Sequence, residues 1–198
     1  MKLNLIERFI TNNSLRAFVQ RHVEGPMLKR MAGLKNYPLC LEIGCGMGVG
    51  AEIIVEQFGA QRVIATDIDP EQIKRAEENR SHKLEDKIEF RVANAMALDE
   101  PDDKFDAVFS FGVIHHMEDW RKAVKEVSRV LKSGGELFFE ELLKTFMNNF
   151  LVSSFTVHPE GGKFDYEEFR SELKKNNVHI TNIKRLGDIA IFGVGRKV

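Results

Sequence analysis

Short apolar runs and amphipathic stretches alternate along most of the chain. The apolar runs are rich in β-branched or aromatic residues, as in buried strands, and they span residues 39–43, 62–69, 88–92 and 105–111. Between them, residues 51–58 and 120–131 carry apolar side chains one helical turn apart and predict amphipathic helices. Because this alternation is typical of a parallel sheet covered on both faces, the pattern predicts an α/β fold.

Acidic residues at three positions predict the starts of further helices. They are Asp69, Asp119 and Asp165, each followed by helix-like sequence. Asp69 precedes a proline at the first helical position, and Asp165 opens a capping box ahead of a helix expected at 169–175. In the helix after Asp119, we expect the charged side chains to form a solvated face: Lys122, Lys125, Glu126 and Arg129. Beyond these helices, strand-like runs at 178–183 and 189–194 predict an antiparallel hairpin.

Composition narrows the class of protein. The chain has 198 residues, enough for one domain with a sizeable core, and a formal net charge of −1 with acids and bases interspersed, which argues against a nucleic-acid partner. No window approaches the roughly 18 apolar residues of a membrane span, and Glu7 interrupts the N-terminus where a signal peptide would be apolar. We therefore expect a cytoplasmic protein. Cys40 and Cys45 are too few for a disulfide framework, and we expect no metal site.

A glycine-rich loop follows the first predicted strand directly. Gly44, Gly46 and Gly48 alternate with other residues, and glycine lets a backbone turn sharply and approach a ligand closely. A dinucleotide fingerprint would need another glycine where Val49 stands. Glu42 lies two residues before the first glycine, and a carboxylate there suits a cationic sulfonium or amine ligand better than a diphosphate.

Asp67 ends the second predicted strand, about twenty residues past this loop, where the ribose of a bound nucleotide commonly lies. Its carboxylate could accept hydrogen bonds from both ribose hydroxyls. It would also repel a 2′-phosphate, which disfavours NADP as the ligand.

From Leu39 to Leu142 the chain resembles the class I S-adenosylmethionine-dependent methyltransferases, in particular the small-molecule group that includes quinone-biosynthesis and sterol methyltransferases. The order and spacing of six short segments carry the resemblance: Leu41–Gly48, Thr66–Asp69, Val92–Ala95, Phe105–Ser110, Ile114–Met117 and Val127–Leu137. The resemblance implies a Rossmann-like, mostly parallel sheet of seven strands in the order 3-2-1-4-5-7-6, with the last strand antiparallel and helices on both faces.

The same resemblance implies S-adenosylmethionine as the cofactor. It implies that the glycines lie along the methionine and ribose portions, with Glu42 near the amino group, Asp67 at the ribose and Ile68 on the adenine. Asn94 stands where the family often has an aspartate that contacts the adenine amino group, which an asparagine oxygen can also do; its alternative role is to cap a turn. The cofactor-binding candidates are Glu42, Gly44, Cys45, Gly46, Gly48, Asp67, Ile68, Asn94, Ala95 and Ser110.

Methyl transfer from a sulfonium is an in-line displacement, so alignment and exclusion of water supply most of the acceleration. A base is needed only where the acceptor has a proton to lose. The catalytic candidates are His115 and His116, after the fourth strand, and Glu140, near the end of the fifth. Because side chains alternate along a strand, only one of Glu140 and Glu141 can face the cleft. Packing and loop hydrogen bonding are the alternative roles of both histidines.

We divide the chain into four segments of one methyltransferase domain. They are residues 1–36 as an N-terminal helical lid with apolar inner faces, 37–143 as the cofactor-binding core, 144–164 as a substrate-side segment, and 165–198 as a C-terminal helix and hairpin. The phenylalanine-rich stretch at 146–155 suits an apolar or aromatic acceptor, with core packing as its alternative role. His158 lies in the same segment.

The sequence therefore favours a methyltransferase that acts on a small, hydrophobic or aromatic molecule. After the fourth strand it has Ser110-Phe111-Gly112-Val113 in place of the Asn/Asp-Pro-Pro-aromatic tetrapeptide of many enzymes that methylate amino groups of nucleic acids and proteins. The alternatives are a cofactor-binding protein without transferase activity and another S-adenosylmethionine-using transferase, such as an aminopropyl transferase. A nicotinamide dehydrogenase ranks last.

Overall fold

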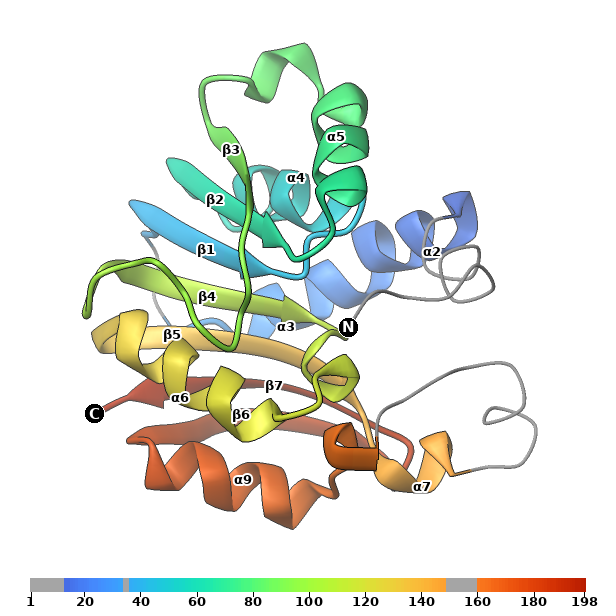
Figure 1. Ribbon diagram of the computed structural model, residues 1–198, viewed down its shortest axis with the longest axis vertical. Helices are drawn as coiled ribbons and strands as arrows, with labels where there is room; N and C mark the ends of the chain where they lie inside the picture. Colours follow the sequence, from blue (N-terminus) through green and yellow to red (C-terminus); the bar gives the residue numbers. More distant parts are fainter. Residues whose placement is uncertain (1–12, 34–35, 149–159) are drawn as a thin grey trace.

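The computed structural model describes residues 13–33, 36–148 and 160–198, and its centre is one twisted sheet (Figure 1). The sheet has seven strands in the order β3-β2-β1-β4-β5-β7-β6. The strands are β1 (Leu39–Ile43), β2 (Arg62–Asp67), β3 (Ile88–Val92), β4 (Phe105–Phe111), β5 (Leu131–Leu142), β6 (Val178–Leu186) and β7 (Ala190–Lys197). Only β7 runs antiparallel to its neighbours. The predicted fold class and strand order are confirmed.

Helices cover both faces of the sheet. They are α2 (Ser14–Val19), α3 (Gly25–Met31), α4 (Val49–Glu56), α5 (Pro70–Asn79), α6 (Trp120–Val130), α7 (Lys144–Met147) and α9 (Tyr166–Lys175), with short turns η1 (Gln20–Glu24), η2 (His82–Leu84), η3 (Ile114–His116) and η4 (Glu160–Gly162). One core cluster joins the sheet to α3, α4 and α5, and the other joins it to α6 and α9 (Figure 1). Neighbouring strand residues such as Phe138 and Phe139 belong to opposite clusters, because successive side chains point to opposite faces.

The predicted helix caps are present. The side chain of Asp69 accepts from the amide of Glu71, and that of Asp119 accepts from Lys122. Asp165 forms a complete capping box with Glu168. The predicted bounds shift by a few residues: α4 begins at Val49 because Gly48 is its N-cap, and both strands of the C-terminal hairpin are longer than their apolar cores. The hairpin strands are longer than predicted because their backbone pairing continues beyond the apolar runs at 178–183 and 189–194.

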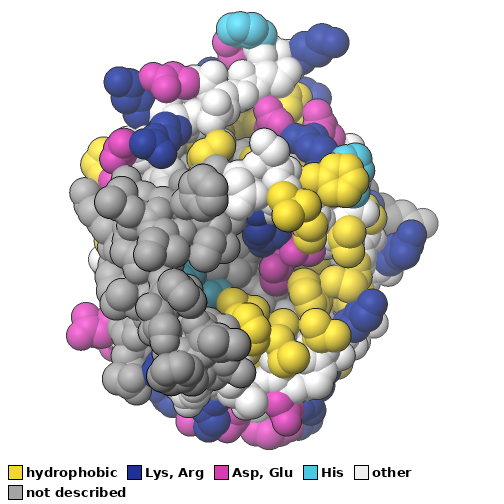
Figure 2. Space-filling model, turned by 90° about the vertical axis from the view of Figure 1, so that its right-hand side faces the viewer, with side chains coloured by type: hydrophobic (Ala, Val, Ile, Leu, Met, Phe, Trp, Pro, Cys, Tyr) yellow, Lys and Arg dark blue, Asp and Glu magenta, His cyan; other side chains and the backbone are white. Residues whose placement is uncertain are grey.

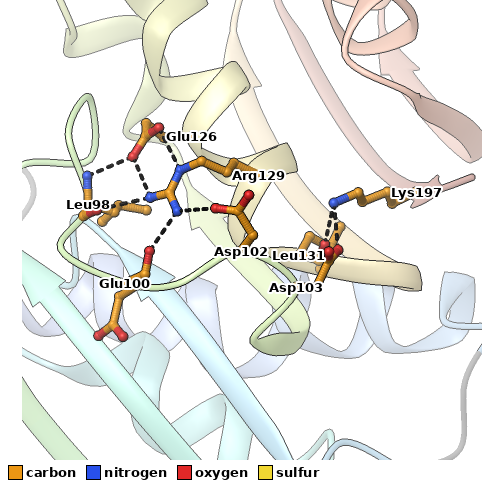
Figure 3. Close-up of polar contacts among 8 residues, drawn as sticks. All are labelled: Leu98, Glu100, Asp102, Asp103, Glu126, Arg129, Leu131 and Lys197. Carbon is orange, nitrogen blue, oxygen red and sulfur yellow. Dashed lines mark hydrogen bonds and ion pairs between the residues drawn. The ribbon is translucent and has the colours of Figure 1, made fainter.

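The expectation that Glu126 and Arg129 belong to a solvated face is wrong. Figure 3 shows the Arg129 guanidinium inside the loop that follows β3, where it donates to the carbonyl oxygens of Leu98 and Glu100 at 2.9 and 2.6 Å. It also pairs with Asp102 and Glu126, and Glu126 accepts from the Leu98 amide. Arg129 therefore ties this loop to α6, and residues at the start of the same loop line the cavity described below.

Candidate active site

A cavity of about 470 Å³ lies where the parallel strands end. Figure 2 looks onto this end of the sheet and shows the hollow, with charged side chains on its floor and hydrophobic side chains along one rim. The walls come from α2 and η1 and from the segments that follow β1 to β5. Ligands of open α/β sheets bind at this edge, so the cavity is the candidate site.

The glycine loop after β1 has a conformation that other residues adopt at a cost. Gly44, Gly46 and Gly48 have φ angles of +66°, +50° and +86°. A Cβ on Gly44 would overlap Val113, whereas one on Gly48 would meet Phe90 in the core. Gly44 and Gly46 line the cavity, but Gly48 is not among its lining residues. Gly48 therefore packs at the start of α4, and its contact with a cofactor stays a prediction.

Asp67, at the end of β2, is held rigidly at the cavity. Its Oδ2 accepts from the amide of Gly46 at 3.0 Å, and its Oδ1 accepts from the amide of Asp69 at 2.9 Å. Burial raises the pKa of Asp67, while these backbone hydrogen bonds oppose the shift. Ile68 lines the cavity beside it with its side chain partly exposed. Both residues lie at the carboxyl edge of the sheet, and their contacts with a nucleoside stay a prediction.

Glu42, in β1, is a buried carboxylate without a counter-charge. It is 1% exposed, and its Oε2 accepts no hydrogen bond from any described residue. Burial and repulsion from Asp67 raise its pKa to about 8. Gly50 allows this arrangement, since a Cβ there would overlap Glu42 Oε1. Gly50 had no predicted role, although its place in the first turn after the loop was the available signal.

The remaining cofactor candidates differ in position. Asn94, Ala95 and Cys45 line the cavity. The Asn94 Oδ1 accepts from the Met96 amide at 3.0 Å, so it has the turn-capping role that was considered as the alternative. Ser110 does not line the cavity, because its hydroxyl points to Glu141 and donates to Oε1 at 2.7 Å.

Glu141 organises the turn that carries the two histidines. It is fully buried and accepts from Ser110, from the amides of Ile114 and His115, and its Oε2 lies 2.8 Å from Nδ1 of His115. Burial raises the pKa of Glu141 to about 8, and the hydrogen bonds oppose the shift. His115 and His116 both line the cavity, with ring centroids 4.3 Å apart. The contact between Glu141, near the end of β5, and His115, in the turn after β4, was not predicted, because it joins segments 26 residues apart in the chain.

Glu140 faces the cavity, as the alternation along β5 allows, and binds the N-terminal helices. Arg16 donates to its Oε1 at 3.2 Å and also pairs with Glu24. The expected apolar inner face of the lid is wrong for the described part. Leu15 and Phe18 are 72% and 58% exposed, because the ion pair of Arg16 with Glu140 in β5 turns the opposite face inward. The residues of α2, its N-cap and η1 that line the cavity are mostly polar: Asn13, Arg16, Ala17, Gln20 and Glu24.

Part of the predicted substrate segment can be described. Leu142 and Phe146 line the cavity. Phe164 instead stacks on Phe169 in the core, with ring centroids 5.0 Å apart. The apolar residues expected in the first part of the lid, the phenylalanines at 150 and 155 and His158 lie outside the described residues.

Neither a metal site nor a membrane-spanning helix is found among the described residues. No group of three or more His, Cys, Asp or Glu side chains there is arranged to hold a metal ion. Nor is any helix in the described ranges both long and apolar enough to cross a membrane.

Comparison with known proteins gives matches over most of this fold. The sequence model of the methyltransferase domain matches residues 41–139. The chain is 36% identical over 161 residues to the 27-O-demethylrifamycin SV methyltransferase of Amycolatopsis mediterranei, covering 78% of this chain and 53% of that protein. It is 40% identical over 113 residues to the 2-methyl-6-phytyl-1,4-hydroquinone methyltransferase of Synechocystis, covering 56% of this chain and 35% of that protein.

The fold also matches solved structures. The crystal structure of a SAM-dependent methyltransferase from Aquifex aeolicus superimposes with a TM-score of 0.75 at 18% identity, covering 100% of both chains. At that identity the match concerns the fold alone. The chain spans about a third to a half of the length of the curated relatives it matches.

Proposed function

The chain belongs to the methyltransferase domain family, and we propose that it transfers a methyl group from S-adenosylmethionine to a small-molecule acceptor. The observation that carries the proposal is the pair of carboxylates, Glu42 and Asp67, beside a glycine loop at the cavity floor. S-adenosylmethionine supplies an electrophilic methyl group on a sulfonium, together with an ammonium group and a ribose. A buried, unpaired carboxylate oxygen on Glu42 fits the ammonium, and the fixed carboxylate of Asp67 fits the ribose hydroxyls.

The residues around this pair fit the rest of the cofactor. Ile68 offers an apolar surface for the adenine, and the amide of Ala95 lies in the adjoining wall. The net negative wall favours a cationic ligand over a diphosphate, which weighs against a nicotinamide cofactor.

Two relatives and the apolar part of the cavity wall bear on the chemical class of the acceptor. The two relatives named above methylate a rifamycin and a hydroquinone, by their descriptions. In this chain Phe111, Leu142 and Phe146 form an apolar part of the cavity wall. We therefore assign a small acceptor with an apolar or aromatic body.

Cys40 and Cys45 are buried and unbridged, which fits a reducing compartment and supports a cytoplasmic location.

His115 is the best-supported base for an acceptor that must lose a proton. With Glu141 ionised, Nδ1 of His115 donates to the carboxylate, and Nε2 is then the basic nitrogen of the ring. Glu141 also fixes the ring by accepting from the backbone of the same turn. The residues otherwise act by holding the reactants in line and excluding water from the cavity.

A label-transfer experiment tests the function. The protein is incubated with S-adenosylmethionine labelled in the methyl group and a panel of small phenols, hydroquinones, alcohols and amines. We expect label in one acceptor class, with one S-adenosylhomocysteine formed for each methyl transferred. For a hydroxyl acceptor, His115→Ala should slow transfer by about 10²- to 10⁴-fold, while His82→Ala, at a side chain 97% exposed, should not.

The product distinguishes the alternative functions. An aminopropyl transferase would release methylthioadenosine from the decarboxylated cofactor instead of S-adenosylhomocysteine. A binding protein would take up the cofactor and transfer label to no acceptor. Either outcome contradicts the proposed methyl transfer.

A further inference from the structure

Three charged side chains meet in the cavity wall opposite the glycine loop, and we call them the Arg16–Glu24–Glu140 cluster. Arg16 pairs with both carboxylates, at 3.2 Å for Oε1 of Glu140. Glu24 is 8% exposed, and Oε2 of Glu140 is buried and accepts from no described residue. Burial and repulsion from Glu24 raise the pKa of Glu140 well above its ordinary value. One guanidinium thus faces two acids, and ionising both would leave the cluster with one uncompensated negative charge.

A distortion of the helix backbone creates this cluster. Residues Gln20–Glu24 form a π-helical turn between α2 and α3. In a regular α-helix, residues eight apart are offset by about 80° around the axis, so Arg16 and Glu24 would diverge. The extra residue in the wider π turn brings Glu24 back to the side of Arg16, and both line the cavity. Such turns are rare and frequently occur at functional sites.

The surroundings of the cluster are apolar. Phe111 is the register partner of Glu140 in the sheet, and Leu142 lies two residues further along the same face of β5. Both line the cavity with the cluster. Figure 2 shows the same combination, with acidic and basic side chains on the floor of the hollow and hydrophobic ones along its rim. Ionising the second acid in this apolar wall is costly unless a ligand of opposite charge compensates it.

We propose that Glu24 and Glu140 bind a protonated amine of the acceptor, whose apolar body contacts Phe111 and Leu142. The inference rests on the proposed methyl transfer, because the cluster shares its cavity with the glycine loop. A carboxylate on the acceptor would be repelled by both acids and would have to displace them from Arg16. A hydroxyl would supply a hydrogen bond but no positive charge, whereas an ammonium supplies a donor together with the charge that favours ionisation of both acids.

Calorimetry with matched probes tests the amine site. The probes are 2-phenylethylamine, 2-phenylethanol and 3-phenylpropanoate, titrated at neutral pH into the full chain with and without saturating S-adenosylhomocysteine. We expect the amine to bind at least about tenfold more tightly than the alcohol, as for a charged hydrogen bond. Glu140→Gln and Glu24→Gln should remove this preference. Glu52→Gln should keep it, because it breaks an ion pair of 2.6 Å with Arg21 at a residue that does not line the cavity.

Three results would overturn the amine site: equal binding of the alcohol or the carboxylate, binding of no probe, or an unchanged preference in Glu140→Gln. Thermal unfolding of the ligand-free variants gives a second readout. Glu140→Gln keeps a neutral side chain beside Glu24, so its Tm should not fall, whereas a Tm lowered as far as in Glu52→Gln would identify an ordinary ion pair and contradict the proposal. S-adenosylhomocysteine binding without amine preference would overturn the amine site alone, whereas its absence in the wild type would overturn the methyl transfer.

Discussion

Single residues in the cavity keep acidic groups in positions that are unfavourable without a ligand. Glu42 is the clearest case, since it is buried beside Asp67 and its Oε2 accepts from no described residue. Buried carboxylates of this kind are common at functional sites, where a ligand compensates the charge.

Glu42 should make the stability of the ligand-free protein depend on pH. Its pKa is about 8 in the folded protein against an ordinary 4.5, so between these values unfolding releases a proton and the free energy of unfolding falls as pH rises. This decrease in the free energy of unfolding is about 1 kcal/mol per pH unit at most, and it should be absent in Glu42→Gln. Urea denaturation at pH 5.5 and pH 8 measures this difference. A variant with the same pH dependence as the wild type would contradict the assignment.

The contact between Glu141 and His115 should fix one tautomer of the imidazole. Above pH 8 Glu141 is ionised, because its pKa is about 8, and it then accepts from the Nδ1 proton. Long-range ¹H–¹⁵N NMR at pH 9 should find His115 protonated at Nδ1 in the wild type. In Glu141→Ala the preference should disappear. A wild-type ring protonated at Nε2 would show that Nε2 cannot act as the base.

The positions that were predicted correctly from the sequence belong to residues in or near a local motif. Asp67 and Glu42 occupy fixed positions relative to the glycine loop, and both line the cavity. Glu141 was considered only as the alternative to Glu140 at the cleft, and Arg16 was given no role, because their observed contacts are with partners 26 to 124 residues away in the chain. Ser110 was assigned to the cofactor, but the same long-range contact with Glu141 turns its hydroxyl away.

At the scale of elements, side-chain clamps fix the segments that line the cavity. Arg129 in α6 bonds the loop after β3 through two carbonyl oxygens and two carboxylates. The η1 turn aligns Arg16 with Glu24 on the cavity side. Neither feature was predictable from periodicity, because both depend on contacts with another element, whereas the caps at Asp69, Asp119 and Asp165 are local and were predicted.

Arg129→Met should lower the free energy of unfolding by about 1–3 kcal/mol, because it leaves the carbonyl oxygens of Leu98 and Glu100 without this donor. Methionine retains much of the apolar stem. The matched control is Arg170→Met, which breaks an exposed pair with Glu167 and should cost less than about 0.5 kcal/mol. Equal losses in urea denaturation would show that Arg129 is an ordinary surface residue.

At the scale of the whole molecule, the strand order explains where the site lies. Strands β1 and β4 are neighbours in the sheet, and the chain leaves them toward opposite sides, which opens a crevice at their carboxyl ends. The resemblance of short segments was enough to predict this order, because the order was taken from the family that these segments resemble. The orientation of α2 and η1 over the crevice was predicted less well, since the ion pairs of Arg16 decide which face of these helices turns inward.

Cofactor binding is the most direct test of the proposed methyl transfer and of its cofactor site. S-adenosylhomocysteine and NAD are titrated calorimetrically into the wild type and Asp67→Ala. We expect micromolar binding of S-adenosylhomocysteine to the wild type. In Asp67→Ala this binding should be weaker by about 1.5–3 kcal/mol, the range for a charged hydrogen-bond partner. No such binding, or tighter binding of NAD, would contradict the proposed methyl transfer and the site assignments built on it.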